Sequence, residues 1–275
     1  MLKQPSTELD IEIKLLLQAI YDKYSYDFRG YSMPSVKRRM SNALAQFDLK
    51  SVTRLQEKIL YDSSFFSELL QFLTIPTSEM FRDPHFFLQM REQVFPILAT
   101  YPSLKIWIAG CSTGEEIYSY AILLKEAGLL DRTTIYATDI NPKSLKKAEQ
   151  GIFPLDKMKE YTVNYQRSGG VNPFSDYYKT DSNSALFDRS LKKNVVFADH
   201  SLATDSVFSE VQLVSCRNVL IYFDQDLQKR AFDLFYESLS RRGFLGLGSK
   251  ETLRFSKYDA LFEQFAKDDK IYRKK

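Results

Sequence analysis

The sequence has few of the residues that build metal centres, disulfides or membrane spans. Its 275 residues include two cysteines and two histidines, whose spacing does not match a zinc site, so we expect no metal. The first ten residues, MLKQPSTELD, are polar and contain no signal-peptide core. Two cysteines without such a signal predict a reducing, cytoplasmic location. No run of eighteen apolar residues occurs, so we expect no membrane insertion.

Charge and length set further bounds on the class of protein. The formal net charge of +3 at pH 7 is too small to indicate nucleic-acid binding on its own, and we expect none. Apolar residues make up 44% of the chain and aromatic residues 14%, which suffices for a substantial core. Apolar residues recur at helical spacing through residues 1–75. We therefore predict an all-α domain over 1–75 and a second domain over 76–275.

The second domain is organised around the stretch Lys105–Tyr120, KIWIAGCSTGEEIYSY. Its apolar run Ile106–Ala109 has the length of one buried strand, and the small residues Gly110–Gly114 are turn-prone. From Glu115 onward apolar residues recur at helical spacing. This pattern predicts a strand, a tight turn and a helix, which is where open α/β sheets bind ligands.

Three chemistries use a turn of this kind. A phosphate-binding P-loop needs a lysine after Gly114, and a dinucleotide fingerprint needs a third glycine. The turn does fit the G-x-S-x-G nucleophile elbow of hydrolases. However, Glu115 and Glu116 follow at once and would repel an oxyanion, and His200 is the only later histidine. The hydrolase interpretation is therefore disfavoured.

Carboxylates beside the turn suit a ligand with hydroxyls or positive charge, and S-adenosylmethionine (SAM) has both. A second predicted strand, Thr134–Asp139, ends in an acid that is well placed to bind ribose hydroxyls. The simpler alternative is that Glu115 and Glu116 favour a helix N-terminus and Asp139 caps the next helix. Acids at two consecutive strand ends favour the nucleotide-like ligand.

The remaining patterns complete a doubly wound sheet. Further strands are predicted at Val195–Phe197 and Val211–Ser215, followed by closing strands at Gly243–Gly248 and Lys270–Arg273 that we expect to be antiparallel. A polar stretch with a β-hairpin, at about residues 165–193, reads as an insertion. The predicted fold is an α/β domain with a mostly parallel sheet in the order 3-2-1-4-5 and a small β-subdomain.

Two groups of basic residues have both a structural and a functional interpretation. Lys37, Arg38 and Arg39 follow Pro34 on a helix and lie, we expect, beside or opposite its core face. They form either a solvated surface or a docking face for an acidic partner. Arg82 lies in the junction Leu73–Asp83, where an arginine forms a structural salt bridge or binds a carboxylate with its planar fork.

Several stretches together resemble the CheR-type chemotaxis receptor methyltransferases. They are LTIPTSEMFRDP, AGCSTGEEIYSYA, ATDI, FADHSL, CRNVLIYF and RGFLGLGSKETL, in family order over about residues 30–255. The resemblance implies a helical N-terminal domain, a SAM-binding domain with a small β-subdomain, and methyl transfer to glutamate side chains of a chemoreceptor. The chain departs from the family pattern at Pro76, often Asn, at Ser78, often Thr, and at Ser201, often Asn.

Site residues follow from the resemblance position by position. Two of them, Arg82 and Tyr222, match residues placed close to the reacting methyl group. The implied cofactor contacts are Ser78, Arg82, Glu116, Asp139, Ser201, Leu202, Arg217 and Asn218. Two rival functions stay open on sequence alone, namely a methyltransferase acting on another protein or a small molecule, and a non-catalytic module that retains the SAM fold to bind a partner.

Overall fold

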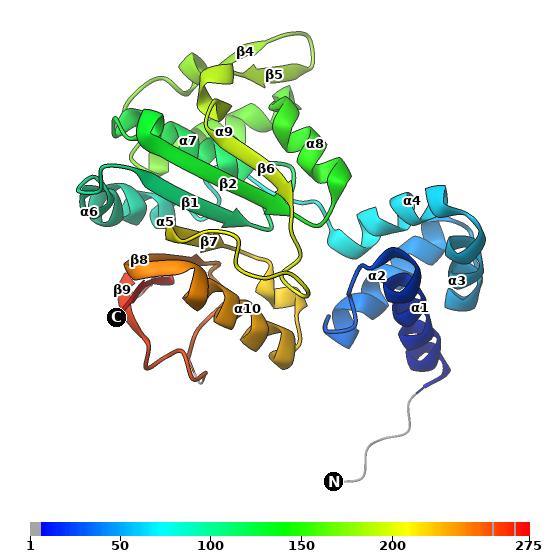
Figure 1. Cartoon of the computed structure of the whole chain (residues 1–275). Coiled ribbons are helices and arrows are strands. Elements are labelled where there is room, and N and C mark those ends of the chain that lie inside the picture. Colours follow the sequence, from blue (N-terminus) through cyan, green and yellow to red (C-terminus); the bar gives the residue numbers. More distant parts are fainter. Residues whose placement is uncertain (1–6, 255, 267) are drawn as a thin grey trace. The chain divides into compact units, whose positions relative to one another are not determined.

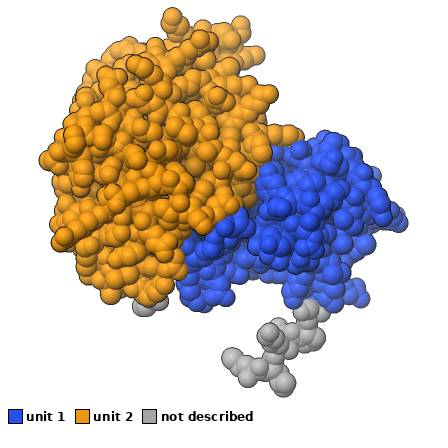
Figure 2. Space-filling model, viewed as in Figure 1, with its two compact units in different colours: residues 1–75, 202–204, 222–231 blue, residues 76–201, 205–221, 232–275 orange. Residues whose placement is uncertain are grey.

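The computed structural model describes residues 7–254, 256–266 and 268–275. The chain forms two compact units, which Figure 2 shows in different colours. Unit 1 consists of residues 1–75, 202–204 and 222–231, and unit 2 of residues 76–201, 205–221 and 232–275. Two segments far along the chain thus belong with the N-terminal helices, which no sequence pattern indicated.

Unit 1 is built from four helices with apolar faces turned inward. They are α1 (Glu8–Tyr24), α2 (Met33–Gln46), α3 (Val52–Tyr61) and α4 (Ser63–Thr74). Two of them begin with side-chain caps, since Thr7 and Asp10 form a reciprocal capping box and Asp62 accepts from the Ser64 and Phe65 amides. These caps satisfy amide groups that the helix itself leaves unpaired.

The structure corrects one prediction for α2, because Arg39 is buried with only 2% of its surface exposed. Its Nη1 donates to the Leu73 carbonyl, and its guanidinium lies 4.4 Å from the centre of the Tyr222 ring, within unit 1. Val36 and Ala43 are buried on the same face. Arg39 therefore belongs to the core face and does not contribute to an exposed docking surface.

The other two basic residues of this cluster differ from Arg39. Lys37 is half-buried and forms an ion pair with Asp10, with Nζ 2.7 Å from Oδ1. Arg38 is exposed. Of the three predicted docking residues, only Arg38 thus offers an exposed charge.

Unit 2 contains a seven-stranded sheet in the order β6-β2-β1-β7-β8-β10-β9. Its first five strands are parallel, and β10 runs antiparallel to both β8 and β9 (Figure 1). The strands are β1 (Leu104–Ala109), β2 (Thr133–Asp139), β6 (Val195–Asp199), β7 (Val211–Cys216), β8 (Leu239–Leu247), β9 (Phe262–Ala266) and β10 (Ile271–Lys274). This confirms the predicted fold class and the 3-2-1-4-5 order, whereas β9 was not predicted.

Helices connect and cover these strands. They are α5 (Pro84–Gln89), the π-helix η1 (Met90–Val94), α6 (Phe95–Leu98), α7 (Glu115–Glu126), α8 (Pro142–Gln150), α9 (Met158–Arg167) and the second half of α10 (Gln225–Ser238), whose residues 225–231 belong to unit 1. Short 3-10 turns lie at Leu130–Arg132, Leu155–Lys157, Phe174–Tyr177, Arg189–Lys192 and Leu220–Tyr222. Among the described residues, no helix has both the length and the apolarity that a membrane crossing requires.

A second, small sheet lies in the insertion of unit 2. It is antiparallel with the order β3-β5-β4, where β3 is Ile152–Pro154, β4 is Tyr178–Thr180 and β5 is Ser184–Phe187. The β4–β5 hairpin falls inside the predicted 165–193 range. Strand β3 precedes that range, helix α9 begins before it and ends inside it at Arg167, and neither element was predicted.

Candidate functional site

The turn between β1 and α7 is held against the end of β2. The amides of Gly110 and Cys111 both donate to the Thr138 carbonyl, at 2.8 and 2.9 Å. Gly114 has φ of 99°, and a Cβ there would lie 2.7 Å from the Cβ of Ala148. Only glycine fits this position, so the turn keeps its backbone close to the neighbouring segment.

Ser112, at the centre of this turn, does not behave as a nucleophile. It has a left-handed φ of 52°, and its buried hydroxyl has no hydrogen-bond partner among the described residues. A serine nucleophile needs an adjacent base, which is missing here. His200 instead packs edge-on against Trp107 at 5.2 Å between ring centres. The hydrolase interpretation finds no support in this geometry, whereas an unpartnered hydroxyl in the turn suits a bound polar ligand.

Asp139 links the turn to the end of β2. Its Oδ2 accepts from the Ser112 amide at 2.8 Å, and its Oδ1 accepts from the Asn141 amide at 2.9 Å. Burial raises the pKa of Asp139 despite these bonds, and Asp199, its register partner on β6, raises it further. The cap of α8 is Asn141, not Asp139 as the simpler alternative required. Asp139, with Asp199 beside it, therefore favours a ligand that brings hydrogen-bond donors or positive charge.

Glu116 and Arg217 form the centre of a buried polar network. Glu116 accepts from the Ser215 hydroxyl at 2.6 Å and from Nη1 of Arg217 at 3.1 Å. Nη2 of Arg217 donates to the Arg82 carbonyl at 2.7 Å and to Oδ2 of Asp83 at 2.8 Å. The Arg217 side chain is 1% exposed. It therefore ties the start of α7 and the end of β7 to the junction that carries Arg82.

Arg82 itself is half-buried, and its guanidinium forms no hydrogen bond or ion pair with any described residue. This excludes, within the described part of the chain, the structural salt bridge that sequence alone allowed. Its neighbours Phe81 and Asp83 have left-handed φ of 52° and 56°. Such backbone strain persists where surrounding contacts fix it, as the bond from the Phe81 amide to the Ser119 hydroxyl does here at 2.9 Å. Arg82 thus lies next to a fixed backbone position, and its guanidinium has no partner within the described part of the chain.

Two buried acids beside these residues are not among the predicted cofactor contacts. Glu115 accepts from the Thr113 hydroxyl at 2.7 Å and from Ser78, and burial raises its pKa. Glu251 accepts the Asn218 amide at 3.0 Å, and Asn218 has a left-handed φ of 60°. Glu115 stands next to Glu116 in the motif, and Glu251 lies in the quoted stretch RGFLGLGSKETL, where its spacing does not mark it as a site residue.

The other predicted residues lie as follows. The Ser201 amide donates to Oδ2 of Asp205 at 2.9 Å, in the loop after β6. Leu202 and Tyr222 belong to unit 1, where Leu202 is buried and Tyr222 is half-buried with its carbonyl accepting from the Ser32 amide at 2.8 Å. Within unit 2, the structure brings Glu116, Arg217 and the Arg82 backbone into direct contact. Asp139 lies at the end of β2, and loops carry Ser78, Ser201 and Asn218.

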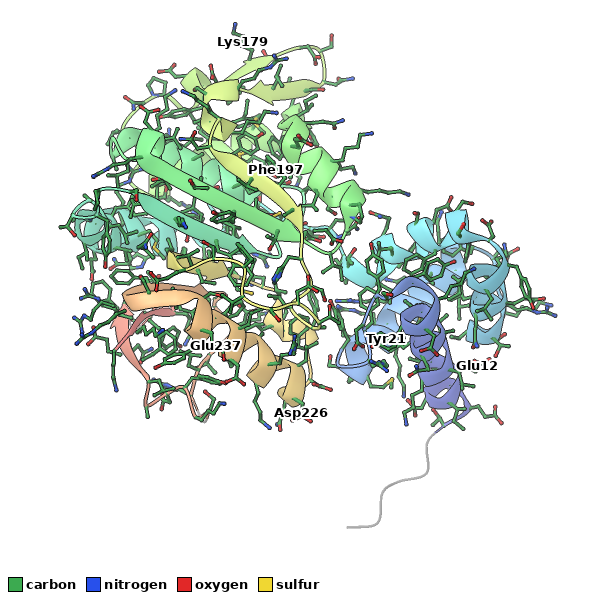
Figure 3. All side chains as sticks on the ribbon, in the orientation of Figure 1. Glu12, Tyr21, Lys179, Phe197, Asp226 and Glu237 are labelled. Atoms are coloured by element: carbon green, nitrogen blue, oxygen red, sulfur yellow. The ribbon has the colours of Figure 1, made fainter. Side chains whose placement is uncertain are left out.

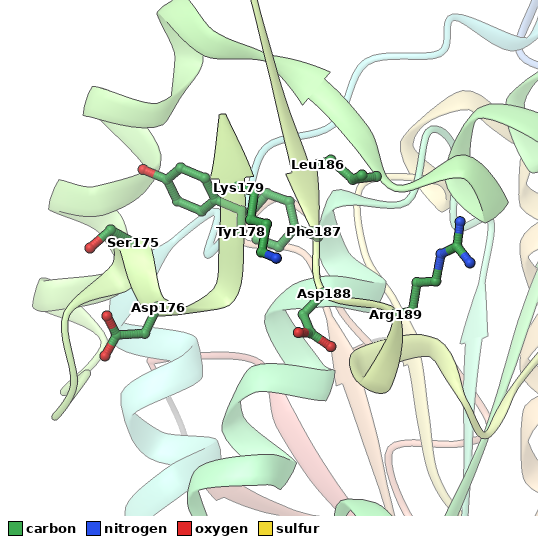
Figure 4. Close-up of a pocket in the computed structure, with 8 residues that line it drawn as sticks. All are labelled: Ser175, Asp176, Tyr178, Lys179, Leu186, Phe187, Asp188 and Arg189. Carbon is green, nitrogen blue, oxygen red and sulfur yellow. The ribbon is translucent and has the colours of Figure 1, made fainter. Parts of the chain in front are cut away.

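A hollow on the small sheet lies apart from these residues. It has a volume of about 530 Å³, and Figure 4 shows the residues that line it, from β4, β5 and the adjoining turns. Lys179 extends outward from this sheet (Figure 3). The lining contains both acidic and basic side chains but none of the predicted site residues. A second, smaller hollow of about 40 Å³ is lined by Arg217 and Asp83, so the size of a hollow does not locate the candidate site.

Comparison with known proteins agrees with this geometry. The family model "CheR methyltransferase, SAM binding domain" matches residues 76–271, and the model of the CheR all-alpha domain matches residues 11–74. The Pseudomonas putida protein Cher3, which bears the name of a methyltransferase, is 62% identical over 265 residues, covering 96% of this chain and 97% of the relative. A chemotaxis protein methyltransferase of Listeria innocua is 30% identical over 229 residues, covering 82% and 84%. The chain belongs to the CheR methyltransferase family and is a SAM-dependent methyltransferase.

Proposed function

We propose that this enzyme transfers the methyl group of SAM to glutamate carboxylates of a chemoreceptor in the cytoplasm, forming methyl esters. The observation that carries the proposal is the unpaired guanidinium of Arg82, since an arginine fork binds a carboxylate in a bidentate geometry. Relatives such as the Listeria innocua protein are named chemotaxis protein methyltransferases. That name supports a receptor as the substrate.

The residues of the β1, β2 and β7 ends fit the cofactor. SAM supplies the methyl group on a positively charged sulfur. Asp139 would accept from its ribose hydroxyls and Glu116 would pair with its ammonium, because carboxylates retain acceptor capacity beyond the bonds that they already make. Arg217 would act by holding Glu116. Further contacts are proposed for Ser78, Ser201, Leu202 and Asn218.

The reaction needs alignment more than proton transfer. A glutamate carboxylate is ionised near pH 7, because its ordinary pKa is about 4.3, so it needs no general base. Arg82 would bind one oxygen of the substrate carboxylate while the other oxygen attacks the methyl carbon of SAM. Tyr222 would pack beside the methyl group. Well-oriented reactants gain roughly 7–11 kcal/mol. The packing role of His200 is compatible with this mechanism.

The decisive experiment incubates the enzyme with radiolabelled SAM and membranes that hold the cognate receptors. We expect base-labile label on the receptor band, as a methyl ester requires. Arg82→Ala should abolish the label while leaving the thermal midpoint near that of the wild type, and Arg82→Lys should rescue poorly because a point charge does not reproduce a planar fork. Label on another protein would show that this protein, and not a receptor, is the substrate. SAM binding by calorimetry without any transfer would favour the non-catalytic module.

We further propose that Arg38, the exposed member of the basic cluster, helps to dock the acidic partner. Arg38→Glu should reduce receptor methylation severalfold at low salt and leave SAM affinity unchanged, with the loss shrinking as salt screens the charge. Methylation kinetics at several salt concentrations measure this. A rate unchanged at low salt would assign Arg38 to a solvated surface.

A further inference from the structure

The loop that follows β7 carries three predicted site residues in a row of six. Arg217 and Asn218 come directly after Cys216, and Tyr222 comes four residues later. The backbone reverses at Asn218, whose left-handed φ of 60° is unfavourable for a residue with a side chain. Something outside the loop must therefore hold it in this conformation.

One buried carboxylate holds this loop. Oε2 of Glu251 accepts from the Asn218 amide at 3.0 Å and from the Gly248 amide at 2.6 Å, and Oε1 accepts from the Leu220 amide at 2.7 Å. The Ile221 amide also hydrogen-bonds this carboxylate. Glu251 is 5% exposed. Both oxygens are thus committed to backbone amides, three of which belong to successive parts of the loop.

Gly248, which directly follows β8, lies against both Asn218 and Glu251. A Cβ at this position would lie 2.8 Å from the amide nitrogen of Asn218, from its side-chain nitrogen and from Oε2 of Glu251. The backbone of Gly248 is not left-handed, so the requirement for glycine here comes from space alone. The β8 end and the β7 loop therefore meet without room for a methyl group.

We propose that Glu251 is a positioning residue for catalysis, which fixes the Arg217–Ile221 part of the loop so that Asn218 meets the cofactor correctly and Arg217 holds Glu116. The proposal rests on the proposed roles of Asn218 and Arg217. Glu251 acts through the loop and does not itself touch the cofactor, because its oxygens already accept four amides. Its role resembles that of supporting residues that hold a reacting geometry within a fraction of an ångström.

The test compares two substitutions that disturb the same contact in different ways. Glu251→Gln keeps the volume but turns an amide NH₂ toward backbone donors, and Gly248→Ala inserts a methyl group without altering charge. Both should raise the Kd for SAM about tenfold or more and lower kcat, since small misplacements at a reacting centre cost up to about 100-fold. Calorimetry gives the Kd, and label transfer gives kcat. Gly248→Ala decides the outcome if Glu251→Gln does not fold.

A matched control is Glu126→Gln, which replaces another buried carboxylate in the same unit, far along the chain from this loop. It should lower the thermal midpoint while leaving the Kd for SAM near that of the wild type. The positioning role is overturned if Glu251→Gln lowers only the thermal midpoint. It is also overturned if Glu251→Gln and the control Glu126→Gln raise the Kd for SAM equally. Calorimetry reports on Glu251 even if the receptor proves not to be the substrate, so the two failures are distinguishable.

Discussion

The carboxyl edge of the large sheet and the small antiparallel sheet both depend on buried carboxylates, but the donors differ. At the edge, Asp139 and Glu251 accept from backbone amides. At the insertion, Glu126 of α7 accepts from the side chains of Tyr165, Tyr177 and Arg91. The first pattern fixes the course of loops, and the second fixes the packing of a subdomain. Among these three carboxylates, the kind of donor thus separates the two acids that shape loops from the one that anchors a subdomain, whereas Glu116 at the same edge accepts from the side chains of Ser215 and Arg217.

The anchor of the insertion is a cluster of side chains on one carboxylate. Glu126, at the end of α7, accepts from the hydroxyls of Tyr165 and Tyr177 and from Nη2 of Arg91 at 2.6 Å. Its side chain is 2% exposed. Around it, rings such as Phe174 and Phe187 pack at 5.9 Å between centres. Polar anchoring and aromatic packing together therefore hold the insertion on the large sheet.

Arg217→Ala should give the largest effect, because it removes the cation that joins two carboxylates and a carbonyl at the edge. Leaving Glu116 and Asp83 without their partner should cost about 3–5 kcal/mol of unfolding free energy, and activity should fall on the order of 100-fold. Urea unfolding and label transfer measure the two effects. Arg217→Lys should recover part of the stability and little activity. Full activity in either variant would show that the network is only structural.

Glu126→Ala should come next, with an effect confined to stability. It leaves Arg91 and two phenols without their acceptor, so the unfolding free energy should fall by about 3 kcal/mol. The Kd for SAM of the folded variant should stay within about twofold of the wild type. The control is Glu160→Ala, which breaks an exposed pair with Lys157 and should cost less than about 0.5 kcal/mol. A large change in the Kd for SAM in Glu126→Ala would contradict the distinction between the carboxyl edge and the insertion.

A smaller effect is an opposite response to pH in the two regions. Burial opposes ionisation of Glu126, but hydrogen bonds from Tyr165, Tyr177 and Arg91 outweigh it and lower its pKa. Its contribution to stability is therefore present above the unfolded-state pKa and is lost as pH falls through the folded-state value. The pKa of Asp139 is raised by burial, so the folded state binds more protons and stability falls as pH rises between its two pKa values.

Urea unfolding at several pH values, with Glu126→Gln and Asp139→Asn beside the wild type, tests these signs. The difference between wild type and Glu126→Gln should shrink toward low pH. Relative to wild type, Asp139→Asn should gain stability as pH rises. Acids that do not interact with the substituted residue cancel in each difference, whereas the titration of Asp199 changes together with that of Asp139. Equal slopes for both variants would contradict the contrast between the two regions.

The sequence predicted what depends on local pattern. An apolar run followed by glycines and then acids predicted β1, the turn and α7, and the spacing of later runs predicted the order of five strands. Burial of Arg39 was also readable, since it follows Val36 by three positions and precedes Ala43 by four, on one helix face. The prediction was wrong because a charged residue was assumed to be solvated.

What the sequence did not indicate depends on contacts between distant residues. Glu251 bonds to amides 33 and 31 residues earlier, so no local spacing marks it. Strand β3 has three residues, one of them proline, which is too short for a period-two pattern. Of the site, the acids at the strand ends were predictable, and the network that commits Arg217 to Glu116 and Asp83 was not.

The smallest expected effect concerns the hollow on the small sheet. Lys179 lines this hollow of about 530 Å³ and is exposed, so Lys179→Ala should alter the unfolding free energy by less than about 0.5 kcal/mol. Because the lining shares no residue with the candidate cofactor site, the Kd for SAM should also stay within about twofold. Calorimetry with wild type and variant at one salt concentration measures this. Lys179 lies on β4. A Kd for SAM that is tenfold weaker in Lys179→Ala would therefore mean that the small sheet influences cofactor binding at the carboxyl edge. The distinction between a structural insertion and a binding edge would then be wrong.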